Sequence, residues 1–342
     1  MKKNVRIQDI AQMLGVSTST VSRALRDAHD VNPVTRRKVL ELTQQLNFKP
    51  NKNAAALASG NTKNIGILLP FITNYYFSTV ISGIQEEAYE QGYNIILFVT
   101  NDDVEREKKL IKNIDNTSLD GLLISISSNS NIKDHFENMM REGMPIVFFD
   151  RVPHDIYASK VVQSDFDGAY TATRHLIEKG YTRIAHIAGP QDLSFTQERW
   201  KGYCRALKDT YLPYLEKYVV FSGFSQQHGQ QDIQELFSLA DPPDAIFAVN
   251  DRKAVGAIQA LKTLKYHVGK DIGVIGFTND PIATVIEPHL TTVEEPAFEI
   301  GKQSCKLLIR HIKNKDFEPR EIVIPGKLIV RDSVRIGSLS FL

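Results

Sequence analysis

Four hydrogen-bonding side chains near the N-terminus have types and spacing suited to contacting DNA: Thr18, Ser19, Ser22 and Arg23. On a helix, Val21 and Leu25 would share one face and pack inward, which leaves these four on the other face. Hydroxyl groups bind base edges or phosphates, and a guanidinium binds guanine or phosphate. We therefore expect Thr18 and Ser19 to read bases, Ser22 to bind a phosphate, and Arg23 to bind either.

The surrounding residues predict the element that positions these groups. Three apolar residues have the spacing of a first helix: Ile10, Ala11 and Leu14. Gly15 allows a sharp turn, and Ser17 can cap a second helix that begins there. Residues 7–25 thus predict a helix-turn-helix, whose second helix enters the major groove. An ordinary helical hairpin with a polar face is the alternative.

The pattern I-x-D-I-A-x-x-x-G-V-S-x-x-T-V-S-R-x-L in this stretch resembles the headpiece of the lactose/galactose repressor (LacI-type) family, and the resemblance continues through the chain. It implies a transcriptional regulator, expected to be a repressor, that binds a pseudo-palindromic operator in double-stranded DNA as a homodimer or higher oligomer. Ser17 joins the expected DNA contacts. Arg6 and Arg26 depart from the family pattern, which generally has Thr and Asn there.

A third helix over Val34–Leu46 would complete a headpiece spanning 1–49. The alanine-rich residues 50–61 that follow favour helix, but so short a helix is unstable alone in water. The resemblance implies a hinge helix in the minor groove, contacting DNA through three residues: Asn51, Ala54 and Leu57. Leu57 would wedge a base step apart. The alternative is a linker with Leu57 tucked against the body.

Charge is distributed unevenly along the 342 residues, whose net charge is +1. Residues 1–60 contain ten Lys or Arg and four Asp or Glu, so the head carries +6 and the remainder −5. A basic head on a mildly acidic body is typical of a DNA reader with a separate sensing domain.

Composition and cysteine placement predict the cellular setting. No apolar run follows the N-terminal lysines, and no stretch is apolar for long enough to span a membrane. Cys204 and Cys305 lie far apart, and neither a disulfide nor a metal site is indicated. We expect a cytoplasmic protein without a metal or cofactor.

From Asn64 onward, short apolar strands alternate with amphipathic helices, which predicts parallel sheets covered on both faces. The first nine strands are expected at 64–70, 93–100, 120–126, 145–150, 161–165, 183–189, 218–223, 244–250 and 271–277. A pause after the fifth suggests two subdomains with a cleft between them. The resemblance implies a periplasmic-binding-protein-like body. We expect the N-terminal effector-binding subdomain to contain 62–163 with 291–322, and the C-terminal one 164–290 with 323–342.

Ligands in open α/β sheets bind beyond the carboxyl ends of the strands. By strand position and by the resemblance, eight residues are expected to bind an effector: Tyr76, Phe77, Ser127, Asp150, Arg199, Phe224, Asn250 and Thr278. Aromatic rings, a carboxylate and an amide suit a sugar-like molecule. Thr278 replaces the Asp that the family usually has, which disfavours an ordinary hexose. Leu193 stands where purine-sensing members carry Arg, which disfavours a purine.

Four of these residues also have a structural interpretation. Asp150 can pair with Arg151, and Arg199 can brace the cleft without touching a ligand. Tyr76 and Phe77 can belong to the core. Asp251, beside Asn250, is expected to cap the next helix.

An enzymatic function is not indicated. No nucleophile elbow, P-loop or dinucleotide-binding glycine motif follows a strand, and the nine histidines lack the spacing of a helical metal site. We expect an allosteric regulator in which the effector favours one arrangement of the two subdomains. The opposing class is a solute-binding protein, or a chaperone-like binding module, without a DNA role.

Overall fold

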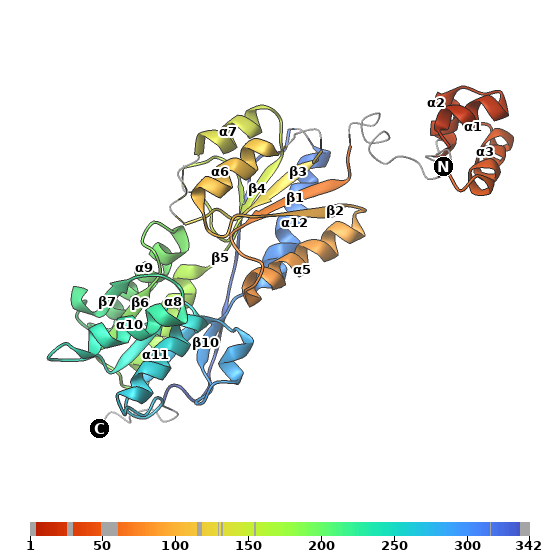
Figure 1. The fold of residues 1–342 in the computed structure, drawn as a ribbon. Coiled ribbons are helices and arrows are strands. Elements are labelled where there is room, and N and C mark those ends of the chain that lie inside the picture. The colour runs from red at the N-terminus through yellow and green to blue at the C-terminus, as the bar shows by residue number, and fades with distance from the viewer. Residues whose placement is uncertain are drawn as a thin grey trace. The chain divides into compact units, whose positions relative to one another are not determined.

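The computed structural model divides the chain into two compact units, Met1–Thr62 and Lys63–Leu342, each treated separately below (Figure 1). The residues that the structure describes are 5–25, 30–48, 61–114, 118–128, 130, 133–153, 155–314 and 316–335.

The described residues of the first unit form a three-helix domain. Its helices are α1 (Ile7–Leu14), α2 (Thr18–Leu25) and α3 (Pro33–Gln45). Ile10, Val21 and Val39 are fully buried where the helices meet. The Asn32 side chain accepts a hydrogen bond of 2.8 Å from the Val34 N–H and so caps α3, with a proline in the first turn. Local cap chemistry therefore sets where this helix begins.

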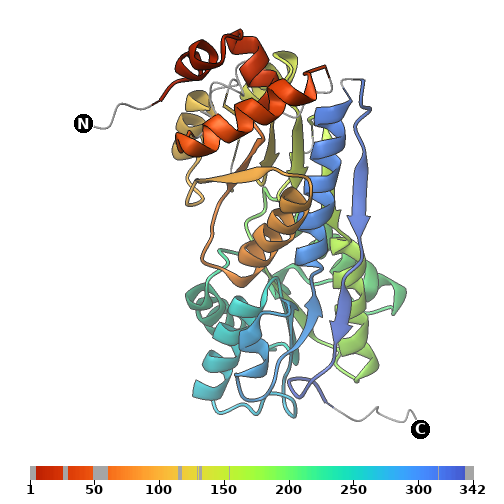
Figure 2. The same ribbon diagram turned by 90° about the vertical axis from the view of Figure 1, so that its right-hand side faces the viewer.

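The second unit contains two six-stranded sheets, and all strands of the first sheet are parallel. In spatial order these strands are β11 (Glu321–Ile324), β5 (Ser159–Gln163), β4 (Ile146–Phe149), β3 (Gly121–Ile124), β1 (Asn64–Leu69) and β2 (Asn94–Val99). The hydrophobic core on one face is covered by α5 (Tyr75–Glu90) and α12 (Ala297–Lys313). The other face is covered by α6 (Val104–Asn113) and α7 (Lys133–Arg141). Figure 2 shows α5 and α12 packed side by side.

The second sheet is parallel except for one edge strand. In spatial order its strands are β12 (Lys327–Ile329), β10 (Thr291–Glu294), β9 (Gly273–Thr278), β8 (Ala245–Ala248), β6 (Ile184–Ala188) and β7 (Val219–Phe221). Strand β12 runs antiparallel to β10. Helices α8 (Asp165–Glu178) and α9 (Ser194–Asp209) cover one face, and α10 (Gln226–Phe237) and α11 (Asp251–Thr263) cover the other. Two short 3₁₀ turns complete this subdomain, Glu216–Tyr218 and Pro281–Thr284.

The chain passes between the two sheets three times: after β5, after β10, and between β11 and β12. The expected boundary at residue 291 is wrong, because Thr291–Glu294 pairs with β9 in the second sheet and the crossing falls after it. The boundary at 322 is also wrong, since β11 continues to Ile324 beside β5. Nothing in a four-residue strand indicates which sheet it joins, so only the pairing partner decides.

Neither thiol forms a disulfide: Cys204 is half-buried on α9 and Cys305 is buried on α12. Within the described ranges, no helix combines the length and the apolar character needed to cross a bilayer. In the same ranges, no group of three or more histidine, cysteine or acidic side chains is arranged to hold a metal ion.

Candidate functional site

The turn between α1 and α2 has the geometry that the sequence predicts. Gly15 has φ of +63°, a left-handed conformation that costs glycine little. The Val16 N–H donates to the Ala11 carbonyl at 3.0 Å, which closes the end of α1. At its other end, the Asp9 carboxylate accepts the Arg6 N–H at 2.7 Å. The family generally has a Thr at position 6, where this chain has Arg6. The hydrogen bond from the Arg6 N–H to Asp9 therefore supplies part of the helix cap that a Thr side chain would give.

Ser17 caps α2, as predicted. Its hydroxyl oxygen accepts the Thr20 N–H at 3.1 Å and also lies 2.7 Å from the Ser19 hydroxyl. Thr18, Ser19 and Arg23 are exposed, whereas Ser22 is half-buried. The helix therefore presents a short polar surface to solvent.

Arg23 has a partner that the sequence did not indicate. Its guanidinium lies 3.0 Å from the Asp30 carboxylate, and both side chains are more than half exposed. An ion pair this exposed contributes little to stability, so the guanidinium can exchange Asp30 for a phosphate or a guanine. The three expected hinge contacts lie outside the described residues and stay predictions: Asn51, Ala54 and Leu57.

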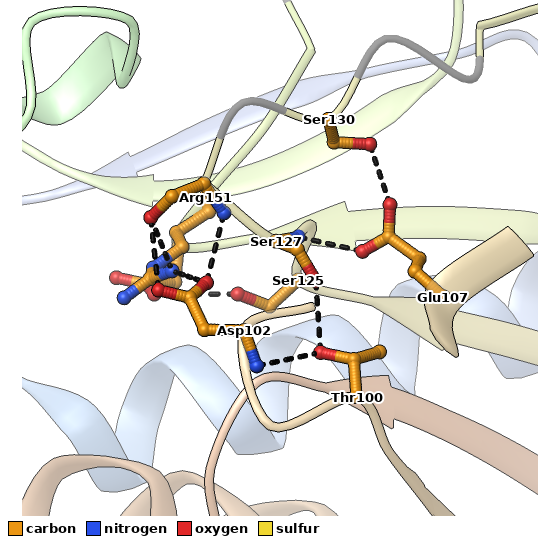
Figure 3. A network of polar contacts seen from close by, with 9 residues as sticks. Thr100, Asp102, Glu107, Ser125, Ser127, Ser130 and Arg151 are labelled. Carbon is orange, nitrogen blue, oxygen red and sulfur yellow. Dashed lines mark hydrogen bonds and ion pairs between the residues drawn. The ribbon is translucent and has the colours of Figure 1, made fainter. Parts of the chain in front are cut away.

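The carboxyl ends of β2, β3 and β4 meet in a polar network (Figure 3). The Ser127 hydroxyl lies 2.8 Å from that of Thr100, and the Ser127 N–H donates to Glu107 at 2.6 Å. Burial raises the pKa of the Glu107 carboxyl, while hydrogen bonds from Ser130 and Ser127 lower it. Because Ser127 is fully buried and already hydrogen-bonded, its hydroxyl joins strand ends and does not face a ligand.

Asp150 follows β4 and adopts a left-handed backbone with φ of +58°, which is uncommon for a residue with a side chain. Its carboxylate accepts a hydrogen bond from Ser125 at 3.3 Å. Burial raises its pKa to about 6, while the charge of Arg151 and a hydrogen bond from Tyr76 lower it. The alternative ion pair with Arg151 does not form, since Arg151 pairs instead with Asp102 at 2.6 Å.

The hydrogen bonds of Arg199 are those of a side chain that braces the cleft. Its Nε donates to Asp165 at 2.7 Å, its Nη1 to the Val249 carbonyl at 2.6 Å, and its Nη2 to Glu295 at 2.5 Å. The guanidinium also lies 3.6 Å from the ring centre of Phe277. All three nitrogens are therefore engaged within the protein, and the side chain is 5% exposed.

The structure places the two neighbouring aromatic residues, Tyr76 and Phe77, in different surroundings. Phe77 is 2% exposed and belongs to the core beneath α5, which is its structural interpretation. Tyr76 is also buried but lines a hollow between the subdomains, and burial followed by the charge of Asp150 raises its pKa well above the usual value. Phe224 is half-buried and stacks on Phe195 with ring centres 5.7 Å apart.

Asn250, and not Asp251, caps α11. The Asn250 side-chain oxygen accepts the Lys253 N–H at 2.8 Å, and its amide nitrogen donates to the Phe224 carbonyl at 3.2 Å. Asp251 is 1% exposed and accepts hydrogen bonds from the Thr292 hydroxyl at 2.6 Å and the Asp280 N–H at 2.7 Å. The expectation for Asp251 is wrong because the helix begins one residue earlier than the cap assignment assumed.

The hollow has a volume of about 350 Å³ and lies where the chain crosses between the subdomains. It is lined by Tyr75, Tyr76, Thr79, Thr278, Asn279, Glu294, Glu295, Pro296, Ala297, Phe298, Glu299, Pro325 and Lys327. Thr278 has φ of +125°, a strained conformation for a β-branched residue, and such strain concentrates at functional sites. Of the eight expected effector residues, only Tyr76 and Thr278 line this hollow.

Two charged residues near the cleft were not among the predicted site residues: Asp102 and Glu295. Each follows a strand end, so the rule that identified Asp150 applies to them as well. Glu295 pairs with Arg199 of the second subdomain. Its place beside Arg199 could be predicted only if β10 were assigned to the second sheet.

Comparison with known proteins identifies the family. Residues 6–51 match the family described as bacterial regulatory proteins of the lacI family, and residues 173–334 match a periplasmic-binding-protein-like domain. The HTH-type transcriptional repressor PurR of Vibrio vulnificus is 31% identical over 331 residues, which cover 96% of this chain and 98% of the relative.

Two solved structures also match over nearly the whole chain. A complex of the transcriptional regulator CelR with cellobiose is 27% identical, with a TM-score of 0.74, over 96% of this chain and 99% of that one. The Lac repressor dimer bound to operator and the anti-inducer ONPF is 24% identical, with a TM-score of 0.85 over 97% and 100% of the two chains, and supports the fold alone. The chain therefore belongs to the LacI family and is a DNA-binding transcriptional regulator with a helix-turn-helix headpiece and an effector-binding body.

Proposed function

We propose that two copies of the chain place their α2 helices on a pseudo-palindromic operator and repress transcription there. The observation that carries this proposal is the exposed polar surface of α2, with Thr18, Ser19 and Arg23, on a unit of formal charge +6. One helix-turn-helix reads few base pairs, so two-fold binding supplies the specificity. This activity belongs in the cytoplasm, where the operator is, and needs no catalytic step.

Effector binding between the subdomains is the second part of the proposal. Four of the expected residues have geometry that supports it: Tyr76, Asp150, Phe224 and Thr278. Phe77, Ser127, Arg199 and Asn250 act through packing or internal hydrogen bonds. Aromatic rings beside acceptor groups suit a carbohydrate-related molecule, and CelR is a relative that was solved with cellobiose.

The proposed DNA binding is tested by replacing Leu57 with Ala, which removes the proposed minor-groove wedge. Operator affinity should fall about tenfold or more, because the wedge and its bent duplex contribute several kcal/mol. Fluorescence anisotropy with labelled duplexes selected by the protein from a random pool measures this effect.

The matched control is Leu40→Ala, a change of the same size at an exposed leucine of α3. Effector affinity should stay unchanged in both variants. Unaltered operator affinity in Leu57→Ala would argue against a hinge wedge. Failure of the unmodified chain to select any duplex would refute the whole proposal.

Trp200 offers a readout of effector binding. It is the single tryptophan, it follows Arg199 on α9, and its ring contacts those of Tyr214 and Phe221. Rearrangement of the subdomains around Arg199 should change its environment, so we expect a bound carbohydrate to shift or quench its emission. Constant emission during a titration in which calorimetry records binding would contradict this.

A further inference from the structure

Arg151 and Arg199 both reach the region between the subdomains, but their hydrogen-bonding states differ. Arg199 uses Nε, Nη1 and Nη2 within the protein. Arg151 uses only Nη1, which donates to Asp102 at 2.6 Å and to the Ser128 hydroxyl at 3.3 Å. Among the residues that the structure describes, Nε and Nη2 of Arg151 have no hydrogen-bond or ion-pair partner.

The position of the Arg151 guanidinium is fixed from several directions. Its centre lies 5.9 Å from the ring centre of Phe71 and 5.4 Å from that of Phe224. Phe71 follows β1 in the first subdomain, whereas Phe224 belongs to the second. The Arg151 carbonyl also accepts the Ile126 N–H at 3.1 Å. Arg151 therefore bridges the two subdomains beside the proposed effector site, with its side chain 6% exposed.

Two carboxylates lie near the Arg151 guanidinium: Asp102, which pairs with Nη1, and Asp150, whose pKa is raised by burial and lowered by the charge of Arg151. Asp102 is itself engaged by the Ser128 N–H at 2.8 Å and the Ser128 hydroxyl at 3.0 Å, so it has little freedom to rotate toward Nε. Figure 3 shows Asp102 and Ser125 close to Arg151 at the strand ends. Asp102 thus anchors one end of the guanidinium, and within the described residues neither carboxylate is hydrogen-bonded to Nε or Nη2.

The free edge has a definite chemical preference. Nε–H and Nη2–H of a guanidinium point in parallel and match the two oxygens of a carboxylate or phosphate, and hydrogen bonds of this kind are about twice as strong as neutral ones. Stacked rings and an anchored tip reduce the side-chain entropy lost on binding. A neutral hydroxyl group uses this edge less well.

We propose that the effector carries a carboxylate or phosphate group and that Arg151 binds it, which makes Arg151 the residue that selects an anionic ligand. This inference rests on the proposed effector function of the same site. Tyr76 and Asp150 remain for the hydroxyl groups of the ligand, while Arg199 holds the second subdomain together.

The test is calorimetry of the full chain with inorganic phosphate, acetate, glucose, glucuronate and glucose 6-phosphate. At least one anionic probe should bind about tenfold or more tightly than glucose, the range expected for charge-assisted hydrogen bonds. Comparison of glucuronate with acetate, and of glucose 6-phosphate with inorganic phosphate, separates a carboxylate ligand from a phosphate ligand.

Two variants act in opposite directions. Arg151→Gln should abolish the preference for anions, with Arg151→Lys recovering part of it. Asp102→Asn should increase anion affinity several-fold, because it removes the competing charge. That gain cannot result from misfolding. Arg205→Gln is the matched control, since Arg205 is exposed and pairs only with Asp209 on its own helix.

Equal binding of glucose and the anionic sugars, an anion preference retained in Arg151→Gln, or no response to any anionic probe would each overturn the inference. Operator binding is measured in parallel. An intact operator complex with a failed anion test refutes only the role of Arg151, whereas loss of operator selection by the unmodified chain refutes the proposed function itself.

Discussion

Replacement of Arg199 with Met is expected to lower the free energy of unfolding by about 3–5 kcal/mol, the usual cost of removing one partner from a buried ion-pair network. The change leaves the Asp165 and Glu295 carboxylates, which are 9% and 7% exposed, without their shared cation. It also removes a hydrogen bond to the Val249 carbonyl. Urea unfolding followed by circular dichroism measures the loss.

Further variants separate bracing from ligand binding. Adding Asp165→Asn and Glu295→Gln to Arg199→Met should restore part of the stability, because the orphaned charges are removed. Arg205→Gln, at a side chain that is 59% exposed, should change stability by less than about 0.5 kcal/mol. Unchanged stability in Arg199→Met together with lost effector binding would show that Arg199 serves the ligand and not the fold.

Asp251 should reduce stability as pH rises from 5 to 8, against the opposite contribution of His186, whose pKa burial lowers to about 3. Burial raises the pKa of Asp251 to about 7, although hydrogen bonds from Thr292 and the Asp280 N–H lower it. In the unfolded chain an aspartate has a pKa near its ordinary value of 3.8. The folded state therefore binds the extra proton between these values.

The direction in which Asp251 changes stability with pH follows from this difference in proton binding. Below the unfolded pKa the group is protonated in both states and contributes nothing, and above the folded pKa the burial of its charge is fully unfavourable. The size is on the order of 4 kcal/mol at most. Burial also raises the pKa of Asp150 to about 6 and that of Asp165 to about 7, so both act in the same direction.

Asp251→Asn is therefore expected to flatten the pH dependence and to raise the urea midpoint at pH 8 more than at pH 5. Asp271→Asn is the control, because backbone and side-chain hydrogen bonds from His267 lower the pKa of that exposed carboxyl. It should leave the slope in this range unchanged. A slope that persists unaltered in Asp251→Asn would assign the pH dependence to other carboxyls.

Structural features that depend only on nearby residues were predicted correctly from the sequence. The turn at Gly15, the Ser17 cap and the buried face at Val21 depend on neighbours within one helical turn. The uniformly apolar strands likewise predicted parallel sheets, since a strand buried on both faces has no polar side. The family resemblance then assigned the fold and the DNA-binding function.

The candidate effector site was predicted less completely, because its hydrogen bonds join residues far apart in the chain. Sequence position identified Ser127, Arg199 and Asn250 as possible ligand groups but did not show that Thr100, Glu295 and the Phe224 carbonyl already engage them. The rule that ligands bind beyond strand ends identifies polar residues at those ends. It does not distinguish residues that bind a ligand from residues that hydrogen-bond to each other.

The amino-acid sequence by itself determined the helix-turn-helix, the alternation of strands and helices, and the basic head, because each depends on local spacing or composition. Tertiary structure alone decided that β10 joins the second sheet, that Arg199 is saturated, and that Arg151 keeps one edge free. The physical reason is that a donor's availability depends on which acceptors the fold brings within about 3 Å of it, and those acceptors come from distant segments.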